Sequence, residues 1–202
     1  MLCAVLSGCG GSSEDAGNGG AVATPPAYPD GPYGTAEGDT IDDLSLPGWG
    51  DPVGEGYDVT KIAEVKLGDF YDPDGTHGIR LLIVNSCTIW CGPCRERYST
   101  FSAKFAPYAA QGVALVGSLT ERLPGEPAGQ GDVAAWAETY AVDFPFALDA
   151  ASVLHAFALS STDTRTDVIV SPRDMRIVAR VGLGPNGNQD LWSVIDEQLA
   201  AR

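Results

Sequence analysis

The 202-residue sequence predicts an α/β domain with a mixed central sheet flanked by helices. Two near-continuous apolar runs of strand length, residues 80–86 and 113–119, enclose a segment with helical periodicity. Two further strand-like runs, residues 167–171 and 175–182, follow one another across a short turn. A β-α-β unit, an inserted helical part and a closing β-β-α unit together predict both parallel and antiparallel strands.

The first part of the domain carries weaker signals. Residues 38–52 predict a short first strand and a loop, and residues 58–75 predict a brief second strand. The second segment ends in Asp-Pro-Asp-Gly at residues 72–75, a sequence typical of a tight turn. We therefore expect short strands before the first long one.

Helical signals occur in three places. Residues 92–112 predict one helix, because aromatic side chains recur there at three- and four-residue spacing. These side chains are Tyr98, Phe101, Phe105 and Tyr108. Residues 132–142, with Asp132 as the N-cap, and residues 149–159 predict the inserted helical segment after the first β-α-β unit. Residues 188–202 predict a last helix.

Charge separates the N-terminal stretch from the rest of the chain. Residues 1–60 hold ten acidic residues and no Lys or Arg, whereas the other 142 residues hold seventeen acidic and twelve basic ones. Such an acidic stretch, rich in Gly, Ser and Pro near its start, is typical of a solvated, self-repelling segment. Because phosphate recognition needs clustered Lys and Arg, nucleic acid is not an expected partner. No apolar run reaches the ~18 residues of a membrane-spanning helix.

The chain opens with a short apolar run and the tetrapeptide Leu-Ser-Gly-Cys, which ends at Cys9. This tetrapeptide resembles the lipobox of bacterial lipoproteins, in which the chain is cut before the cysteine and the cysteine is acylated. The resemblance implies a signal peptide remnant at residues 1–8, lipidation of Cys9, a tether at residues 9–40 and a domain at residues 41–202. Only eight residues precede Cys9 and none is basic, so either translation starts upstream or the tetrapeptide is not a signal.

A lipoprotein of this kind belongs to the cell envelope and faces the periplasm, with the lipid membrane as a partner through Cys9. Gly10 rather than an acid follows the cysteine, which slightly favours the outer membrane over the inner one. Disulfides form and persist in exported compartments. Once Cys3 has left with the signal, three cysteines would remain, all within residues 87–94. An odd number argues against a purely structural disulfide framework.

The remaining cysteines lie where a buried strand leads into a helix. Cys91 falls at the predicted helix start, where unpaired backbone N–H groups and the helix dipole favour a thiolate. Cys94 follows one turn later and reaches the same sulfur, while Gly92 and Pro93 keep the turn tight. Because the thiolate is the nucleophile of disulfide exchange, we expect Cys91 to attack and Cys94 to resolve the mixed disulfide.

The sequence Trp-Cys-Gly-Pro-Cys-Arg at residues 90–95, between a strand and a helix, resembles thioredoxin. The inserted helical part and residues 171–182 are similar to the exported redoxin branch, which includes tethered thiol-disulfide oxidoreductases and thiol-specific antioxidant proteins. The resemblance covers residues 41–202 and implies a thioredoxin-like fold, protein disulfide or dithiol substrates, and a redox partner. It also implies that Trp90 flanks the sulfur and contacts partner proteins. We expect a monomer without a cofactor.

Two positions depart from the thioredoxin pattern. Asn85 stands where thioredoxins carry a buried aspartate that takes the proton of the resolving thiol, so Asp69, Asp72 or water is expected to take it instead. Arg165 falls on or near the position of the family's cis-proline. An arginine there resembles peroxiredoxins, in which it steadies the peroxidatic thiolate, although an exposed loop arginine is the simpler interpretation. A thiol peroxidase that uses Cys91 and Arg165 is therefore an alternative function.

Cys87 ends the predicted strand four residues before Cys91, and three interpretations of it remain open. It is a small buried hydrophobe under the active site, a third redox thiol, or a metal ligand. The Cys87–Cys91 spacing resembles the copper-chaperone branch of the same fold, and thiolates suit Cu(I), with His155 as the candidate histidine. A Cu(I)-binding metallochaperone is thus the alternative from another class. Zinc is disfavoured, because His77 and His155 lack a matching spacing.

The lipobox interpretation predicts that Cys9 attaches the protein to a membrane. When the gene is expressed with its natural upstream sequence, we expect the protein in the membrane fraction and the Cys9→Ala variant in the soluble fraction. Cell fractionation and immunoblotting measure both, with Cys3→Ala as the matched control. The interpretation is wrong if Cys9→Ala stays with the membranes as the wild type does.

Overall fold

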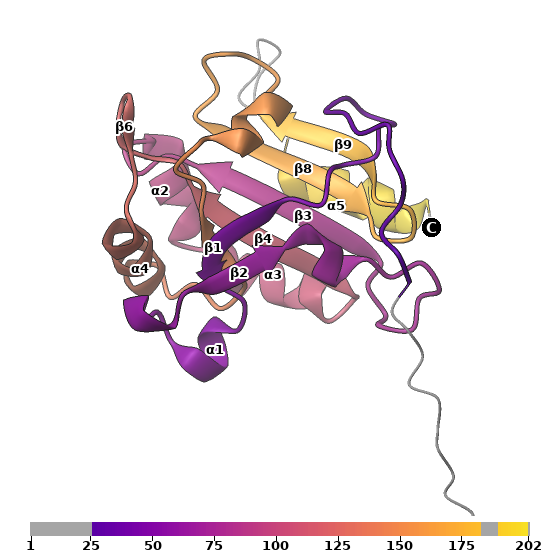
Figure 1. Cartoon of the computed structure of the whole chain (residues 1–202), viewed down its shortest axis with the longest axis horizontal. Coiled ribbons are helices and arrows are strands. Elements are labelled where there is room, and N and C mark those ends of the chain that lie inside the picture. Colours follow the sequence, from indigo (N-terminus) through magenta and orange to yellow (C-terminus); the bar gives the residue numbers. More distant parts are fainter. Residues whose placement is uncertain (1–25, 183–189, 202) are drawn as a thin grey trace, which may run out of the picture.

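The computed structural model describes residues 26–182 and 190–201, which fold around a seven-stranded mixed sheet (Figure 1). The strand order in this sheet is β2-β1-β7-β4-β3-β8-β9. The strands are β1 (Ser45–Trp49), β2 (Ala63–Lys66), β3 (Leu81–Cys87), β4 (Val113–Leu119), β7 (Phe146–Leu148), β8 (Arg165–Ser171) and β9 (Arg176–Gly182), with a separate hairpin of β5 (Glu121–Leu123) and β6 (Glu126–Pro127). The helices are α1 (Pro52–Glu55), α2 (Gly92–Tyr98), α3 (Phe101–Ala109), α4 (Gln130–Thr139) and α5 (Leu191–Ala200), with the 3₁₀ helices η1 (Val59–Lys61), η2 (Leu67–Phe70) and η3 (Val153–Phe157).

Strand β3 has both kinds of neighbour in the mixed sheet. It runs parallel to β4 and antiparallel to β8, and β9 then pairs antiparallel with β8. In the register of β3 and β8, Asn85 lies opposite Asp167, and Cys87 lies opposite Arg165. The mixed sheet with flanking helices confirms the α/β architecture that the sequence predicts.

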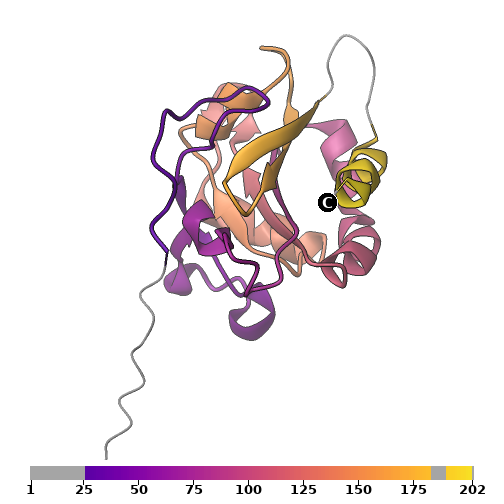
Figure 2. The ribbon, with the colours of Figure 1, turned by 90° about the vertical axis from the view of Figure 1, so that its right-hand side faces the viewer.

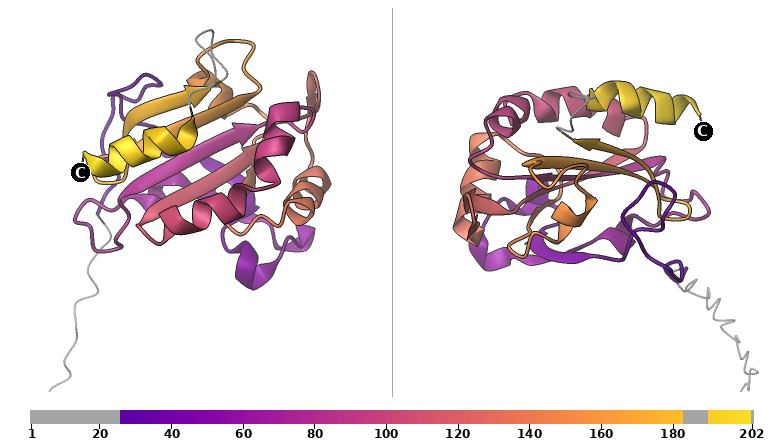
Figure 3. Two further views of the ribbon diagram at one scale, coloured as in Figure 1. Left: turned by 180° about the vertical axis from the view of Figure 1, so that it is seen from behind. Right: turned by 90° about the horizontal axis from the view of Figure 1, so that it is seen from above.

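The sheet is covered on both faces, as Figures 2 and 3 show. Helices α2, α3 and α5 lie against one face, whereas the N-terminal segment and η3 lie against the other. All seven residues of β3 are buried. Leu81 and Ile83 pack into the apolar cluster on the helix side, and Leu82 and Val84 pack into the cluster on the opposite side. The continuous apolar sequence of β3 is therefore explained by burial on both faces.

The helix predicted over residues 92–112 is instead two helices, α2 and α3, separated by Ser99 and Thr100. The hydroxyl groups of these two residues donate to backbone carbonyls three residues earlier, at 2.6 and 3.4 Å. Such side-chain bonds compete with the helical ladder and favour a break. The aromatic periodicity did not reveal the break, because Tyr98 and Phe101 pack into the same cluster on either side of it.

The inserted part is less helical than the sequence predicts. Helix α4 has Gly129 as its N-cap, and the carboxylate of Asp132 accepts a hydrogen bond from the Gly129 backbone N–H at 2.9 Å. Asp132 therefore supports the first turn from inside the helix. The second helix predicted at residues 149–159 is only the short η3, and the β5–β6 hairpin precedes α4.

The packed domain begins before residue 41, the boundary expected from the sequence. The backbone N–H of Gly38 donates to the carbonyl of Ile177 in β9 at 2.8 Å. The hydroxyl of Tyr28 donates to the carbonyl of Ile41 at 2.8 Å. These bonds hold residues 28–40 against the sheet, so this part of the expected tether belongs to the domain. Backbone pairing with a distant strand leaves no local trace in the sequence.

The expected signal at residues 1–8 and the lipidation site Cys9 lie outside the described residues. Within residues 26–182 and 190–201, no helix is both long enough and apolar enough to cross a membrane.

Gly117 in β4 is predicted to be intolerant of a larger side chain. A Cβ there would lie 2.6 Å from Cδ2 of Phe146 and 2.9 Å from the hydroxyl oxygen of Tyr98, and both side chains are fully buried. Gly117→Ala should lower the free energy of unfolding by about 1–3 kcal/mol through overpacking. Gly131→Ala is the matched control, because nothing lies within 4 Å of a Cβ at Gly131. Urea denaturation compares the two, and equal effects would contradict this packing.

Candidate active site

Cys91 is the N-cap of α2, at the point where the chain leaves β3. Its backbone N–H donates to the carbonyl of Thr88 at 3.2 Å, which closes a turn between strand and helix. Gly92 and Pro93 occupy the first positions of α2, where the missing N–H of proline costs nothing. The backbone N–H of Cys94 donates to Sγ of Cys91 at 3.2 Å. The structure thus places Cys91 at a helix N-terminus, where the sequence predicts it.

The two thiols differ in their electrostatic surroundings. Hydrogen bonding with Cys94, a hydrogen bond with Thr164 and the charge of Arg165 together lower the pKa of Cys91 to about 6, against the opposing effect of burial. Burial raises the pKa of Cys94, and hydrogen bonding to Cys87 and Cys91 adds to the rise. At neutral pH, Cys91 is therefore a thiolate and Cys94 a thiol, which is the division that an attacking and a resolving thiol need.

Strand β8 begins beside the two cysteines. Sγ of Cys94 lies 3.6 Å from the carbonyl of Thr164, the residue before β8. Arg165 is 8% exposed, so it is not an exposed loop arginine. Its Nε lies 3.9 Å from Oδ2 of Asp167 and has no hydrogen-bond partner among the described residues. The structure therefore brings Arg165 to the active site, while its role stays a prediction.

A buried polar network lies on the same side of the sheet, centred on Asp167. The side-chain amide of Asn85 donates to Oδ1 of Asp167 at 2.7 Å, and the hydroxyl of Tyr98 donates to Oδ1 of Asn85 at 2.6 Å. Arg97 completes the network with an ion pair to Oδ2 of Asp167 at 2.7 Å. Asn85 and Asp167 have no exposed surface. The ion pair and the amide together satisfy a carboxylate that would otherwise be too costly to bury.

The carboxylate next to the cysteines is therefore Asp167, and neither Asp69 nor Asp72. Asp69 is exposed in η2. Asp72 accepts two backbone hydrogen bonds, at 3.1 and 2.9 Å, in the turn that precedes β3. It thus belongs to the end of β3 that is opposite Cys87. The sequence analysis did not single out Asp167, because it was the first residue of the strand predicted at residues 167–171. An acidic residue directly joined to a run of buried apolar residues is the signal that could have identified it.

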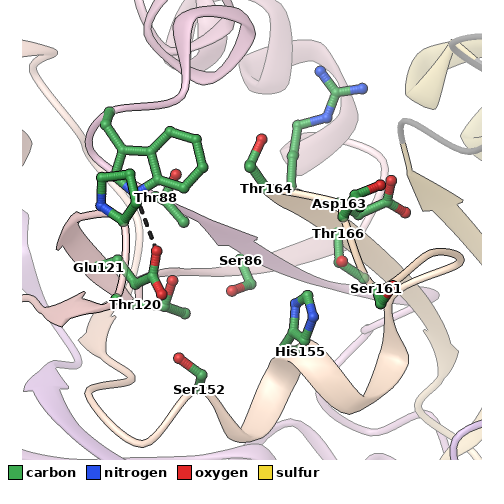
Figure 4. A pocket seen from close by; sticks show the side chains of 15 residues that line it. Ser86, Thr88, Thr120, Glu121, Ser152, His155, Ser161, Asp163, Thr164 and Thr166 are labelled. Carbon is green, nitrogen blue, oxygen red and sulfur yellow. Dashed lines mark hydrogen bonds between the residues drawn. The ribbon is translucent and has the colours of Figure 1, made fainter.

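Trp90 is one of the residues that line a pocket of about 450 Å³, which Figure 4 shows from close by. Its indole N–H donates to Oε2 of Glu121 in β5 at 3.0 Å. Figure 4 shows His155 of η3 facing the pocket, together with many hydroxyl groups. The hydroxyl side chains that line it belong to Ser86, Thr88, Thr120, Ser152, Ser161, Thr162, Thr164 and Thr166. The pocket beside Trp90 therefore offers both hydrogen-bonding groups and apolar contact.

The copper alternative uses Cys87 and Cys91 as ligands, with His155 as the candidate histidine. Among the described residues, no group of three or more His, Cys, Asp and Glu side chains is arranged to hold a metal ion. His155 is exposed in η3, which packs on the opposite face of the sheet from α2. Cys87 is buried, and its thiol donates to Oδ1 of Asn85 at 3.8 Å. The structure therefore does not bring His155 to the two cysteines, and a copper site on Cys87 and Cys91 alone stays a prediction.

A mixed sheet that presents a Cys-Gly-Pro-Cys pair at the start of a helix defines a thioredoxin-like redoxin, of the thiol-disulfide oxidoreductase class. The model of the AhpC/TSA family matches residues 38–179, and the chain belongs to this family. No functionally curated protein matches the chain.

Solved structures share the fold at low sequence identity. A protein from Chlorobium tepidum described as a thiol:disulfide interchange protein DsbE is 21% identical, with a TM-score of 0.57 over 82% of this chain and 96% of that chain. A secreted disulfide oxidoreductase of Mycobacterium tuberculosis, homologous to E. coli DsbE, is 16% identical, with a TM-score of 0.52 over 79% and 96%. AhpC of Enterococcus faecalis is 12% identical, with a TM-score of 0.58 over 82% and 91%. At these identities the likeness confirms the predicted thioredoxin-like fold.

Cys91 is predicted to titrate well below an ordinary thiol. Its pKa of about 6 means that thiolate absorbance should rise as the pH passes through about 6 and should level off near neutral pH. The measurement uses the Cys94→Ser variant, whose hydroxyl can still hydrogen-bond to Cys91, and follows thiolate absorbance against pH. Cys91→Ser supplies the background from the other thiols. A midpoint near the usual ~8.5 would contradict the activated thiolate.

Proposed function

We propose that the protein is an exported, lipid-anchored thiol-disulfide oxidoreductase that exchanges disulfides with protein substrates through Cys91 and Cys94. The observation that carries this proposal is the Cys91 sulfur at the N-terminus of α2, which accepts the Cys94 backbone N–H at 3.2 Å and has a lowered pKa. A nucleophilic thiolate and a buried thiol one helical turn away are the two groups that the exchange requires.

The exchange has two steps. The Cys91 thiolate attacks one sulfur of a substrate disulfide and forms a mixed disulfide, while the other substrate sulfur leaves as a thiolate. Cys94 then loses its proton and attacks the Cys91 sulfur, so that the Cys91–Cys94 disulfide forms and the second substrate thiolate leaves. Two electrons pass from the enzyme to the substrate. The same steps in reverse oxidise a substrate dithiol, and the reduction potentials set the direction.

The second step requires Cys94 to lose its proton. Cys94 has no exposed surface, and its raised pKa opposes formation of the thiolate. The buried carboxylate of Asp167 is already engaged by Asn85 and Arg97. Asp167 is therefore held as an ion pair rather than being a free proton acceptor, and we propose that water takes the proton as the mixed disulfide resolves.

Export and lipid anchoring are supported by the N-terminal sequence and by one structural neighbour, not by the geometry of the active site. The Leu-Ser-Gly-Cys tetrapeptide at Cys9 and the Gly-, Ser- and Pro-rich segment after it are what a lipoprotein needs. One structural neighbour, the oxidoreductase of M. tuberculosis, is described as secreted. The proposed location is the periplasmic side of the cell envelope, with protein thiols or disulfides and a redox partner as the interacting molecules.

Cysteine variants are predicted to separate the two steps. With dithiothreitol as electron source, the wild type should accelerate insulin reduction, and Cys91→Ser should fall to the uncatalysed rate because no nucleophile remains. Cys94→Ser should accumulate a mixed disulfide between Cys91 and the substrate, which non-reducing electrophoresis and mass spectrometry detect. If Cys91→Ser keeps the wild-type rate, another group performs the exchange and the proposal fails.

A thiol peroxidase is a second candidate function, which Arg165 favours. Nε of Arg165 and the hydroxyl oxygen of Thr88 are both buried, and neither has a hydrogen-bond partner among the described residues. The charge of Arg165 also acts on Cys91. These groups could bind the oxygen atoms of a hydroperoxide while the Cys91 thiolate attacks the terminal oxygen. The O–O bond would break, an alcohol would leave, and Cys91 sulfenic acid would condense with Cys94 to give the disulfide and water.

Peroxide consumption tests this second candidate directly. With dithiothreitol as reductant, a peroxidase should consume an organic hydroperoxide far faster than buffer, and Arg165→Gln should slow this more than it slows insulin reduction. Consumption at the buffer rate would exclude the peroxidase and leave disulfide exchange.

A further inference from the structure

Three thiols meet where β3 runs under the start of α2, and the exchange described above uses only two of them. Cys87 is the last residue of β3, and it packs in the helix-side cluster with Cys91 and Cys94. It is 1% exposed, and its thiol donates to Oδ1 of Asn85 at 3.8 Å. Cys87 is therefore held in one orientation inside the active site.

Cys94 lies close to the other two thiols. All three cysteines belong to one buried cluster, and the backbone N–H of Cys94 donates to Sγ of Cys91 at 3.2 Å. The sheet supports this placement independently, because Cys87 pairs with Arg165 across β3 and β8. Sγ of Cys94 lies 3.6 Å from the carbonyl of Thr164, the residue immediately before Arg165. The sulfur atoms of Cys87 and Cys94 thus converge on the same end of β8.

We propose that Cys87 is a third redox thiol, which exchanges with the oxidised pair to form a buried Cys87–Cys94 disulfide and to release Cys91. The inference rests on the proposed disulfide exchange, which supplies the oxidised Cys91–Cys94 pair. Cys87 loses its proton to water and attacks the Cys94 sulfur. The Cys87–Cys94 bond forms, the Cys91–Cys94 bond breaks, and Cys91 leaves as a thiolate. No external oxidant or reductant is consumed, because one disulfide replaces another.

Three features favour this step over an attack on Cys91. Cys94 is the nearer target in the fold, because Cys87 pairs with Arg165 and Sγ of Cys94 contacts the carbonyl of Thr164, the residue before it. Cys91 is the better leaving group, because a thiol of lower pKa leaves faster. The negative charge of the released Cys91 thiolate is also stabilised, since the Cys91 sulfur accepts a hydrogen bond from the Cys94 backbone N–H at 3.2 Å. Cys94 remains within a disulfide throughout, so no thiolate has to form at its fully buried position.

The exchange gives the oxidised protein a free nucleophile. A protein with only the Cys91–Cys94 disulfide can accept electrons from a substrate dithiol, but it cannot attack a substrate disulfide. With the disulfide moved to Cys87 and Cys94, the Cys91 thiolate can attack a substrate disulfide without prior reduction of the enzyme. The proposed third thiol would therefore allow the oxidised protein to rearrange wrong disulfides as well as to form new ones.

Selective labelling of the full-length protein tests the proposal. The protein is oxidised with diamide, unfolded in acid and labelled with N-ethylmaleimide, which marks the free thiols. It is then reduced and labelled with isotopically heavy N-ethylmaleimide, which marks the cysteines that were in disulfides. One tryptic peptide, residues 81–95, carries all three cysteines, so its fragmentation shows which one was free. We expect the first label on Cys91 in a fraction of the molecules well above the fraction in Cys87→Ser. A first label on Cys87 alone, with none on Cys91 above the control, would overturn the proposal.

The Cys91→Ser variant supplies a second measurement. Oxidation should protect both Cys87 and Cys94 from the first label, because these two can still form their own disulfide. The proposal is also overturned if both stay fully labelled. Insulin reduction by the wild type is followed in parallel and tests the proposed function separately. If the wild type reduces insulin but forms no Cys87–Cys94 disulfide, only the proposed redox role of Cys87 is rejected. If it forms this disulfide but does not reduce insulin, only the proposed function is rejected.

Discussion

The carboxylate of Asp167 lies in the core without exposed surface, between the guanidinium of Arg97 and the amide of Asn85. A buried charge is tolerated only when it is paired and its remaining lone pairs are occupied, and here both oxygens have a partner. The pairing joins three elements that are distant in sequence, since Asn85 belongs to β3, Asp167 to β8 and Arg97 to α2. The position of α2 on the sheet, and with it the position of the cysteines, depends on this contact.

The same network divides the work between the two active-site thiols. By fixing α2, it places Cys91 at the helix terminus, where hydrogen bonds lower the pKa of its thiol, and it places Cys94 in the core, where burial raises the pKa of its thiol. Asn85 links the network to Cys87 through a contact of 3.8 Å. Asn85 itself carries no charge; the charge next to it is that of Asp167 on the neighbouring strand β8, and Arg97 neutralises it.

The sequence predicted the features that depend on neighbouring residues. The buried strands β3 and β4, the Cys-Gly-Pro-Cys turn and the helix start at Cys91 are all encoded locally. Contacts between distant residues were missed. Asn85 and Asp167 are 82 residues apart, and Arg97 and Asp167 are 70 residues apart, so no periodicity links them. The docking of residues 28–40 on β9 was missed for the same reason. The break between α2 and α3 depends on local hydroxyl groups and could have been inferred.

A double-mutant cycle on Arg97 and Asp167 tests the central claim most directly. The free energy of unfolding is measured by urea denaturation for the wild type, Arg97→Met, Asp167→Asn and the double variant. If the ion pair fixes α2 on the sheet, each single change leaves a buried group without its partner and should cost about 3–5 kcal/mol. The double variant should then cost clearly less than the sum of the two. Single effects that add to within ~0.5 kcal/mol would show that the two residues do not interact, and would contradict the account.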